Sequence, residues 1–545
     1  MSTIPQSSSA ASTVSSSTVA TKSATEASYD AIPYCSFPVP ASHPDRMYNV
    51  ARLFGLDPVL PENSTVLELG CAGGGNLIPL ASRFPKASFV GVELSKVQCD
   101  YAISAANYVG LKNLEIRHAS ITDINADLGK FDYIICHGVF SWVPDFVRDA
   151  ILQVSSSNLT ERGVAFISYN TLPGWYFRGM LRGMMLQHVQ GIEDPQTKTA
   201  QARTLLKFLA EANEGSNSMH AVFLRNEAVA FDKHPDQYVY HEYLEAHNKA
   251  FYFKEFVEEA FKHGLQFLGE SDLPSNWIGN LNEKAKTKLE NVNDAVLRSH
   301  YMDCINNRTF RESLLVHANA KIDRSISTDL LTAARFSGSL KELDPTDEPS
   351  QSSNSTQKSY KLASGRVLST PERSTQLAAE CLDEVYPCSL SLVELHQQIE
   401  ERLAKESSHS RIELKQLASA MIHWTLSGWI QFRFLDDRMK ASGFNRPKVT
   451  AWTRSQARAG DLVTNQAHNV IRISGPERLV LPMLDGTRDM ASLANEMELL
   501  VRSGAIDLQL TDENRNLKGK ELHRHAAQQI IERLAASSFL LPELK

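Results

Sequence analysis

The stretch VLELGCAGGGN, from Val66 to Asn76, decides the fold of this 545-residue chain. It begins as a continuous apolar run typical of a buried strand, passes through a glycine-rich turn and leads into a segment that fits a helix. Gly70, Gly73 and Gly74 permit a tight turn and let a ligand approach the backbone closely. The first amides of the following helix then face the same space, so the stretch predicts a ligand site.

Two carboxylates indicate which ligand this site takes. Glu68 precedes the glycines, where a carboxylate repels a pyrophosphate but attracts the ammonium group of an amino acid. Glu93 ends the run GVEL, near the ~20-residue offset at which a strand-end acid binds both ribose hydroxyls. The pattern favours S-adenosylmethionine. The alternative is a related domain that binds another nucleotide or has lost its ligand.

The middle position of the turn departs from the usual acidic-x-Gly-x-Gly-x-Gly pattern. Ala72 stands where the second glycine is expected. A methyl group is tolerated there if the backbone does not adopt a positive φ. We therefore expect the fold to persist with a slightly altered loop.

The segments around this turn alternate between strand and helix patterns, which predicts βαβ units and a parallel sheet. A helical insert is expected over 176–236. A sixth strand, QYVYHEYL, then precedes a helix and a last strand, LQFLGES. The expected strands cover 64–70, 87–94, 114–120, 130–138, 162–170, 237–244 and 265–271.

Ligands of such sheets bind beyond the carboxyl ends of the strands, so the residues that follow each strand are candidates for the site. Ser120 or Asp123 would bind the adenine, or else cap a turn. Predicted donor-site residues are Glu68, Gly70, Cys71, Gly73, Gly74, Asn76, Glu93, Leu94, Ser120 and His137. Predicted catalytic residues are His137, Trp142, Tyr169 and Asn170. The predicted substrate rim contains Trp175, His241, Glu242 and Tyr243.

Composition narrows the function classes. The net charge of −7 gives no overall attraction to nucleic acid or to an anionic membrane. No apolar run approaches the ~20 residues that span a bilayer, and no secretory signal is recognisable. The seven cysteines form no C-x-x-C pair. This argues against a disulfide framework or a zinc ribbon, so we expect a cytoplasmic protein without a metal site.

Four quoted segments resemble a known family: YDAIPYCSFPVPASHPDR, VLELGCAGGGNLIP, CHGVFSWVP and SYNTLPGW. They are similar to bacterial class I S-adenosylmethionine-dependent methyltransferases that carry a methyltransferase regulatory domain. HEYLEAHNKAFYFKEFVEEAFKHGLQFLGE and NRTFRESLLVHA resemble that regulatory region, and LDGTRDMASLA extends the resemblance towards the C-terminus. Some members are similar to bacterial protein-lysine methyltransferases.

The resemblance implies an α/β fold with a Rossmann-like seven-stranded sheet, a helical middle region and a C-terminal winged-helix-like α+β domain. The cofactor roles carry over to Glu68, Gly70, Gly74 and Glu93. The expected organisation is a disordered Ser/Thr-rich tail (1–28), a methyltransferase domain with its insert (29–275), a helical middle region (276–343), a linker (344–366) and a winged-helix-like domain (367–545).

The leading hypothesis is in-line methyl transfer from S-adenosylmethionine to a protein lysine amine, with S-adenosylhomocysteine as product. One alternative is a methyltransferase that acts on metabolites. Another is a non-catalytic regulator that senses the cofactor and uses its winged-helix-like region. A DNA-reading helix should carry a row of Arg and Lys, which IELKQLASAMIHWTLSG lacks. We therefore expect a protein substrate, no nucleic acid or membrane partner, and leave a homodimer open.

Overall fold

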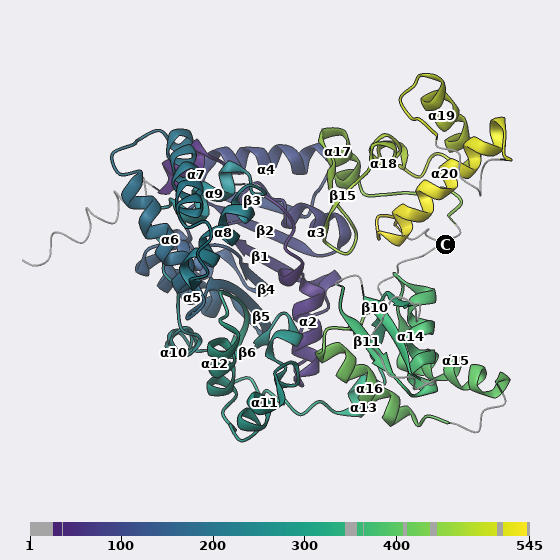
Figure 1. The fold of residues 1–545 in the computed structure, drawn as a ribbon, viewed down its shortest axis with the longest axis horizontal. Coiled ribbons are helices and arrows are strands. Elements are labelled where there is room, and N and C mark those ends of the chain that lie inside the picture. The colour runs from purple at the N-terminus through teal and green to yellow at the C-terminus, as the bar shows by residue number, and fades with distance from the viewer. Residues whose placement is uncertain are drawn as a thin grey trace, which may run out of the picture.

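The computed structural model describes residues 25–34, 36–343, 357–362, 365–406, 411–435, 444–508 and 516–541. Most of the predicted tail lies outside these residues, although 25–31 form a short helix. A seven-stranded sheet with helices on both faces forms the centre of the fold (Figure 1). This confirms the predicted fold class.

The strand order is β3-β2-β1-β4-β5-β7-β6, with β7 antiparallel to both of its neighbours and the pairs among β1–β5 parallel. Reversal of strand order on either side of β1 and β4 leaves a crevice at their carboxyl ends. The strands are β1 (Thr65–Leu69), β2 (Ser88–Glu93), β3 (Leu114–His118), β4 (Phe131–Cys136), β5 (Leu159–Asn170), β6 (Leu265–Glu270) and β7 (Phe310–His317).

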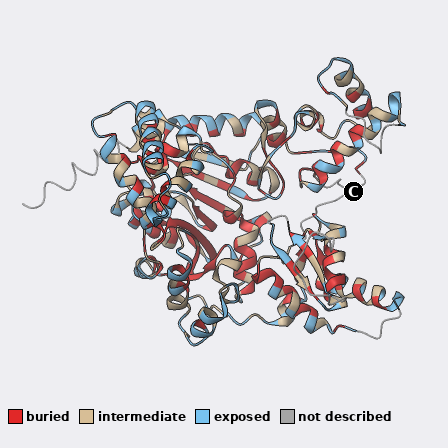
Figure 2. Cartoon of the chain, viewed as in Figure 1, coloured by how far each residue is buried: buried red, intermediate tan, exposed pale blue. Residues whose placement is uncertain are grey.

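Alternate strand residues supply two hydrophobic cores, one on each face of the sheet. Val66 and Phe166 pack on one face, together with the helix Pro44–Leu53, whereas Leu67 and Ile167 pack on the other. Figure 2 shows the middle of the sheet buried, as expected for strands covered on both sides, whereas the edge strand β3 has no buried residue. The covering helices include α2 (Pro44–Leu53), α3 (Leu77–Arg83), α4 (Lys96–Tyr108), α5 (Asp145–Ser157) and α10 (Phe253–Lys262).

One predicted strand was wrong. The segment QYVYHEYL lies in helix α9 (Asp236–Tyr243), although its Tyr and Val content favours a strand. Val239, Tyr240 and Tyr243 share one helix face and are buried in the core of the insert. That insert is a group of four helices, α6 (Trp175–His188), α7 (Pro195–Ala212), α8 (Met219–Phe231) and α9.

The seventh strand lies instead in the region predicted to be mainly helical, 276–343. That region does contain α11 (Glu283–Glu290) and α12 (Ala295–Asn306), but β7 follows them. Arg311 makes the sequence of this strand untypical of a buried strand. In the structure its side chain is fully buried between Glu270 and Asp303, with N–O distances of 2.7 Å to each. The central sheet therefore extends beyond residue 275, the predicted end of its domain.

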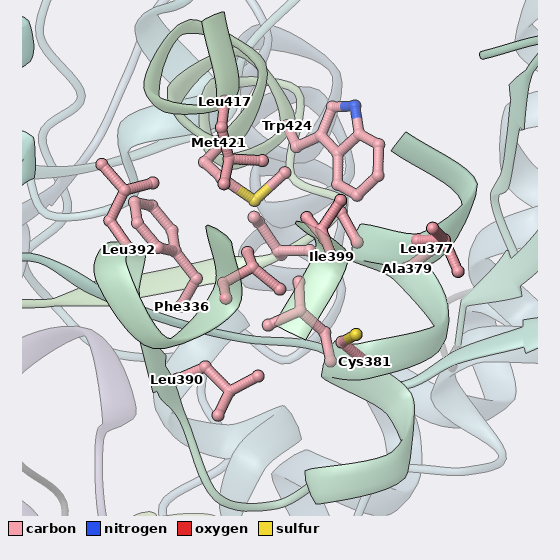
Figure 3. Close-up of a cluster of buried hydrophobic side chains, with 14 of the residues drawn as sticks. Phe336, Leu377, Ala379, Cys381, Leu390, Leu392, Ile399, Leu417, Met421 and Trp424 are labelled. Atoms are coloured by element: carbon pink, nitrogen blue, oxygen red, sulfur yellow. The ribbon is translucent and has the colours of Figure 1, made fainter. Parts of the chain in front are cut away.

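The stretch predicted as one C-terminal unit contains two separate hydrophobic cores. The first joins residues before and after the predicted linker, including Phe336, Ile399 and Trp424 (Figure 3). Residues 358–362 of that linker form a strand, whereas 344–356 lie outside the described residues. This unit contains β8 (Arg335–Ser337), β9 (Leu340–Glu342), β10 (Lys358–Leu362), β11 (Val367–Thr370), β12 (Leu390–Ser391), β13 (Gln431–Arg433), α13 (Thr328–Leu331), α14 (Arg373–Val385), α15 (Leu392–Lys405) and α16 (Leu414–Leu426).

The second core belongs to the C-terminal unit, which packs its helix α17 against α3, one of the helices that cover the central sheet. Its elements are α17 (Ala451–Ala459), β14 (Leu462–Thr464), β15 (Val470–Arg472), α18 (Gly475–Val480), α19 (Met490–Arg502) and α20 (Gly519–Ala536). None of the helices in the described ranges is both long and apolar enough to cross a bilayer.

Candidate active site

A cavity of about 720 Å³ opens at the carboxyl ends of β1, β2, β4 and β5. This volume is within the range of small-molecule sites, which is roughly 300–1,000 Å³. Its walls come from the glycine-rich turn, the strand ends, the insert and an N-terminal strap, which we define as residues 25–34 and 36–39. Among the described residues, no group of His, Cys, Asp and Glu side chains is arranged to hold a metal ion.

The glycine-rich turn adopts the backbone conformation that its sequence predicts. Gly70 and Gly74 have φ values of 76° and 77°, which favour glycine. A Cβ at Gly75 would lie 2.2 Å from the carbonyl oxygen of Ser36 in the strap, so that close approach also requires glycine. Ala72 has a φ of 47°, contrary to the condition under which we expected its methyl group to be tolerated. The turn therefore retains strain at Ala72.

Glu68 presents an unpaired carboxylate oxygen at the cavity. The side chain is buried, and Oε1 accepts a hydrogen bond of 2.8 Å from Asn76 Nδ2. Oε2 has no hydrogen-bond partner among the described residues. Burial raises the pKa of Glu68 to about 8. A buried oxygen without a partner is costly, so this site is built for a ligand that supplies a cation or a donor.

Glu93 stands at the end of β2 on the neighbouring wall of the cavity. Oε2 accepts from the backbone N–H of Ala72 at 2.9 Å, and Oε1 accepts from that of Ser95 at 2.8 Å. These bonds link the acid to the glycine-rich turn and to the start of α4. Burial raises the pKa of Glu93 from its ordinary value. Each carboxylate oxygen can still accept a further bond from a hydroxyl group.

The other predicted donor-site side chains also lie at this cavity. Cys71, Leu94 and Ser120 line it, and so does His137. His137 Nδ1 lies 3.1 Å from Ser168 Oγ. Because burial lowers the pKa of His137 to about 4, its imidazole is neutral at physiological pH. Gly73, which is close to Tyr101, and Gly74 are not among the lining residues.

The predicted catalytic and rim residues separate into two groups. Asn170 lines the cavity, and its Nδ2 is buried with no partner among the described residues. Tyr169 faces the other side of β5 and stacks on Phe256 at 3.9 Å, so its predicted role at the cavity was wrong. Successive strand residues point to opposite faces, which accounts for the difference. The remaining lining residues predicted from the sequence are Trp142, Trp175, His241 and Glu242.

Tyr243 was also wrongly predicted at the rim. Its hydroxyl donates to Glu227 at 2.9 Å inside the core of the insert. His241 reaches the cavity from a helix rather than from a strand end. There it stacks on Tyr29 of the strap, with ring centroids 4.6 Å apart.

One half of the cavity, the aromatic half, is lined by Trp142 and Trp175 and also contains an ion pair. Trp142 and Trp175 pack edge to face at 6.1 Å. Glu242 lies 3.3 Å from Arg178, and burial raises the pKa of Glu242 to about 7. Sequence reasoning missed Arg178, because nothing in the periodicity of α6 distinguishes a cavity-facing Arg from an exposed one. Tyr238 also lines this half and was missed together with the helix that carries it.

The strap closes the cavity from the N-terminal side. Gly75 N–H donates to Ser36 Oγ at 2.7 Å, and Val39 N–H donates to Asn76 Oδ1 at 2.9 Å. Tyr29 and Tyr34 of the strap line the cavity. The contacts of this Pro-rich and aromatic segment with the glycine-rich turn could not be predicted from local sequence pattern.

Three parts of the chain match described protein families. Residues 66–163 match a methyltransferase domain, 235–317 a predicted methyltransferase regulatory domain, and 445–538 the C-terminal winged-helix domain of PKMT proteins. The regulatory match ends with β7, so it includes the last two strands of the central sheet.

Relatives from Rickettsia match most of the chain. An uncharacterized protein of Rickettsia prowazekii is 38% identical over 498 residues, which cover 90% of this chain and 89% of the relative. A second one is 40% identical over 247 residues, 45% of this chain and 99% of the relative. The solved structure of PKMT2 from Rickettsia typhi has a TM-score of 0.81 and 30% identity, covers 93% of this chain and 100% of its own, and has also been solved in complex with AdoHcy.

Glu68 should make thermal stability depend on pH. Below about pH 4.5 its carboxyl is neutral in both the folded and the unfolded protein. Between that pH and about 8 only the unfolded protein ionises it, so the folded state loses stability as the pH rises. Glu68→Gln should therefore raise the melting temperature relative to wild type at pH 8.5, and do so much less at pH 5.

The exposed Glu115→Gln is the matched control, and its difference from wild type should vary much less between the two pH values. Melting curves of the three proteins at pH 5 and pH 8.5 measure both effects. An equal difference between Glu68→Gln and wild type at the two pH values would contradict the raised pKa.

Proposed function

Because this chain is an S-adenosylmethionine-dependent methyltransferase of the PKMT family, we propose that it methylates the side-chain amine of lysine in a protein substrate. The observation that carries the donor half of the proposal is at Glu68, which lines the cavity and whose buried Oε2 has no partner in the described structure. The ammonium group of the donor is the cation that this oxygen would bind. Glu93 would accept the ribose hydroxyls.

We propose that the donor site consists of the residues predicted for it from the sequence. Glycines of the turn give the donor access to the backbone, and the strap covers it from the N-terminal side. When bound, S-adenosylmethionine supplies the methyl group as an electrophilic carbon on a positively charged sulfur. The proposed residues are Glu68, Gly70, Cys71, Gly73, Gly74, Asn76, Glu93, Leu94, Ser120 and His137.

We assign the aromatic half of the cavity to the methyl acceptor, because its side chains suit a lysine. Aromatic rings of Trp142, Trp175 and Tyr238 line it, and such rings attract an alkylammonium ion. Lysine must lose a proton before its nitrogen can attack, from a reference pKa near 10.4. An apolar wall lowers that pKa by disfavouring the charged form.

Glu242 is the proposed proton acceptor. Its pKa of about 7 is close to the working pH, which suits a general base. His137, with a pKa of about 4, is a much weaker base. The carbon–sulfur bond breaks as the carbon–nitrogen bond forms, and the lysine proton leaves through Glu242 to solvent.

We also propose that the protein works in the cytoplasm. Cys71, Cys99, Cys136 and Cys381 are buried thiols, which a reducing compartment maintains.

The homodimer considered from the sequence stays a prediction. Phe208 and Met219 of the insert are 61% and 76% exposed, so a second copy could cover them, and light scattering at several concentrations would give the mass.

Glu93→Gln should weaken the binding of S-adenosylmethionine and S-adenosylhomocysteine by roughly ten- to a hundredfold, since a hydrogen bond to a charged group contributes about 1.5–3 kcal/mol. Isothermal titration calorimetry measures both affinities. Glu115→Gln, which removes an exposed carboxylate of β3, is the control and should bind like wild type. Failure of wild type to bind either compound would refute the donor site.

Glu242→Gln should lower the rate of methyl transfer by about a hundredfold or more, the range expected for loss of a general base, while donor affinity stays near wild type. Transfer of radiolabelled methyl groups into a bacterial lysate measures the rate and sorts the product into protein, nucleic acid and small molecules. The label is expected in protein, as methyl-lysine after hydrolysis. Glu211→Gln, an exposed change in α7, should leave the rate unchanged. Label confined to small molecules or nucleic acid would reject a protein substrate.

A further inference from the structure

A hairpin of the C-terminal unit contacts Asn76, which lines the donor half of the cavity. The turn between β14 and β15, residues 465–469, packs against the start and end of α3. His468 Nε2 lies 2.7 Å from Asn76 Oδ1, and Arg83 Nη1 donates to the carbonyl oxygen of Gln466 at 2.7 Å. Segments almost 400 residues apart in the chain therefore meet beside the glycine-rich turn.

The contact with His468 helps to fix which way the Asn76 amide faces. Oδ1 also accepts from Val39 N–H at 2.9 Å, and a backbone N–H can only donate. His468 must then donate from Nε2. With Oδ1 held by two donors, Nδ2 donates to Glu68 Oε1 at 2.8 Å, and Oε2 is left without a partner among the described residues.

His468 is itself held in one position. It is buried and has a left-handed backbone with φ of 62°. Its ring packs edge to face on His43, with centroids 5.2 Å apart. Burial keeps the pKa of His468 well below its ordinary value, so the imidazole stays neutral and one ring nitrogen keeps the donated proton.

We propose that His468 is a positioning residue of the donor site, and that binding of the methyl donor and docking of the C-terminal unit stabilise each other. This inference rests on the proposed donor site. Coupling is reciprocal by thermodynamic linkage: whatever the hairpin adds to donor affinity, the donor adds to hairpin docking. The C-terminal winged-helix domain is then a structural part of the catalytic unit rather than an appended module.

Hydrogen exchange on the wild-type protein tests the coupling without any substitution. Addition of saturating S-adenosylhomocysteine should slow amide exchange in residues 462–472, although the hairpin turn does not line the cavity. Unchanged exchange in this segment, with the compound shown to be bound by calorimetry, would overturn the inference.

His468→Ala should weaken donor binding by about tenfold, the effect of a lost buried hydrogen bond. KM for the donor should rise by a similar factor while kcat changes little. His468→Gln, which restores an N–H donor, should recover most of the affinity. The matched control is Ala467→Ser, an exposed change in the same turn, and it should bind like wild type.

A double-mutant cycle separates positioning from a general loss of stability. If His468 acts through Asn76, the losses for His468→Ala and Asn76→Ala will not add in the double variant. Additive losses would reject the positioning role. Full affinity in His468→Ala would reject it too and leave the proposed function intact, whereas absence of donor binding in wild type would reject the proposed function itself.

Discussion

The buried amide of Asn76 is the contact on which the donor site depends. Its oxygen accepts from Val39 in the strap and from His468 in the C-terminal hairpin, while its nitrogen donates to Ser42 and Glu68. One side chain thus satisfies four partners from three parts of the chain. A buried carboxylate without this support would be costly. The sheet supplies Glu68, but the strap and the hairpin determine how it is presented.

The sheet explains why the cavity lies where it does. Parallel strands bring the ends of β1, β2, β4 and β5 to one edge, and the reversal of strand order opens a crevice there. Strand alternation then selects which residues reach it, which is why Asn170 lines the cavity and Tyr169 belongs to the core. The acceptor half is different in origin, because Trp175 and Glu242 come from helices of the insert.

Local sequence pattern was sufficient to predict β1–β5 and to bring Glu68 and Glu93 to one cavity, because apolar runs, glycines and strand-end acids lie within about 30 residues of each other. It failed where distant contacts override local preference. Arg311 makes the sequence of β7 too polar to predict a central strand. In the fold, Glu270 and Asp303 pair with this side chain. Val239 and Tyr240 favour a strand locally but are buried on one face of α9. His468 carried no local signal, since its partner is nearly 400 residues away.

Ionisable side chains occur in both halves of the cavity. Three carboxylates line it, those of Glu68, Glu93 and Glu242, and among the described lining residues Arg178 is the one Arg or Lys side chain. Burial raises the pKa of all three acids, which favours their neutral forms. Each cation that enters favours the ionised form of the acid beside it. The ammonium and sulfonium groups of the donor and a lysine ammonium are such cations. Methyl transfer removes the sulfonium charge, and with it one of the charges that favour the ionised forms of these acids.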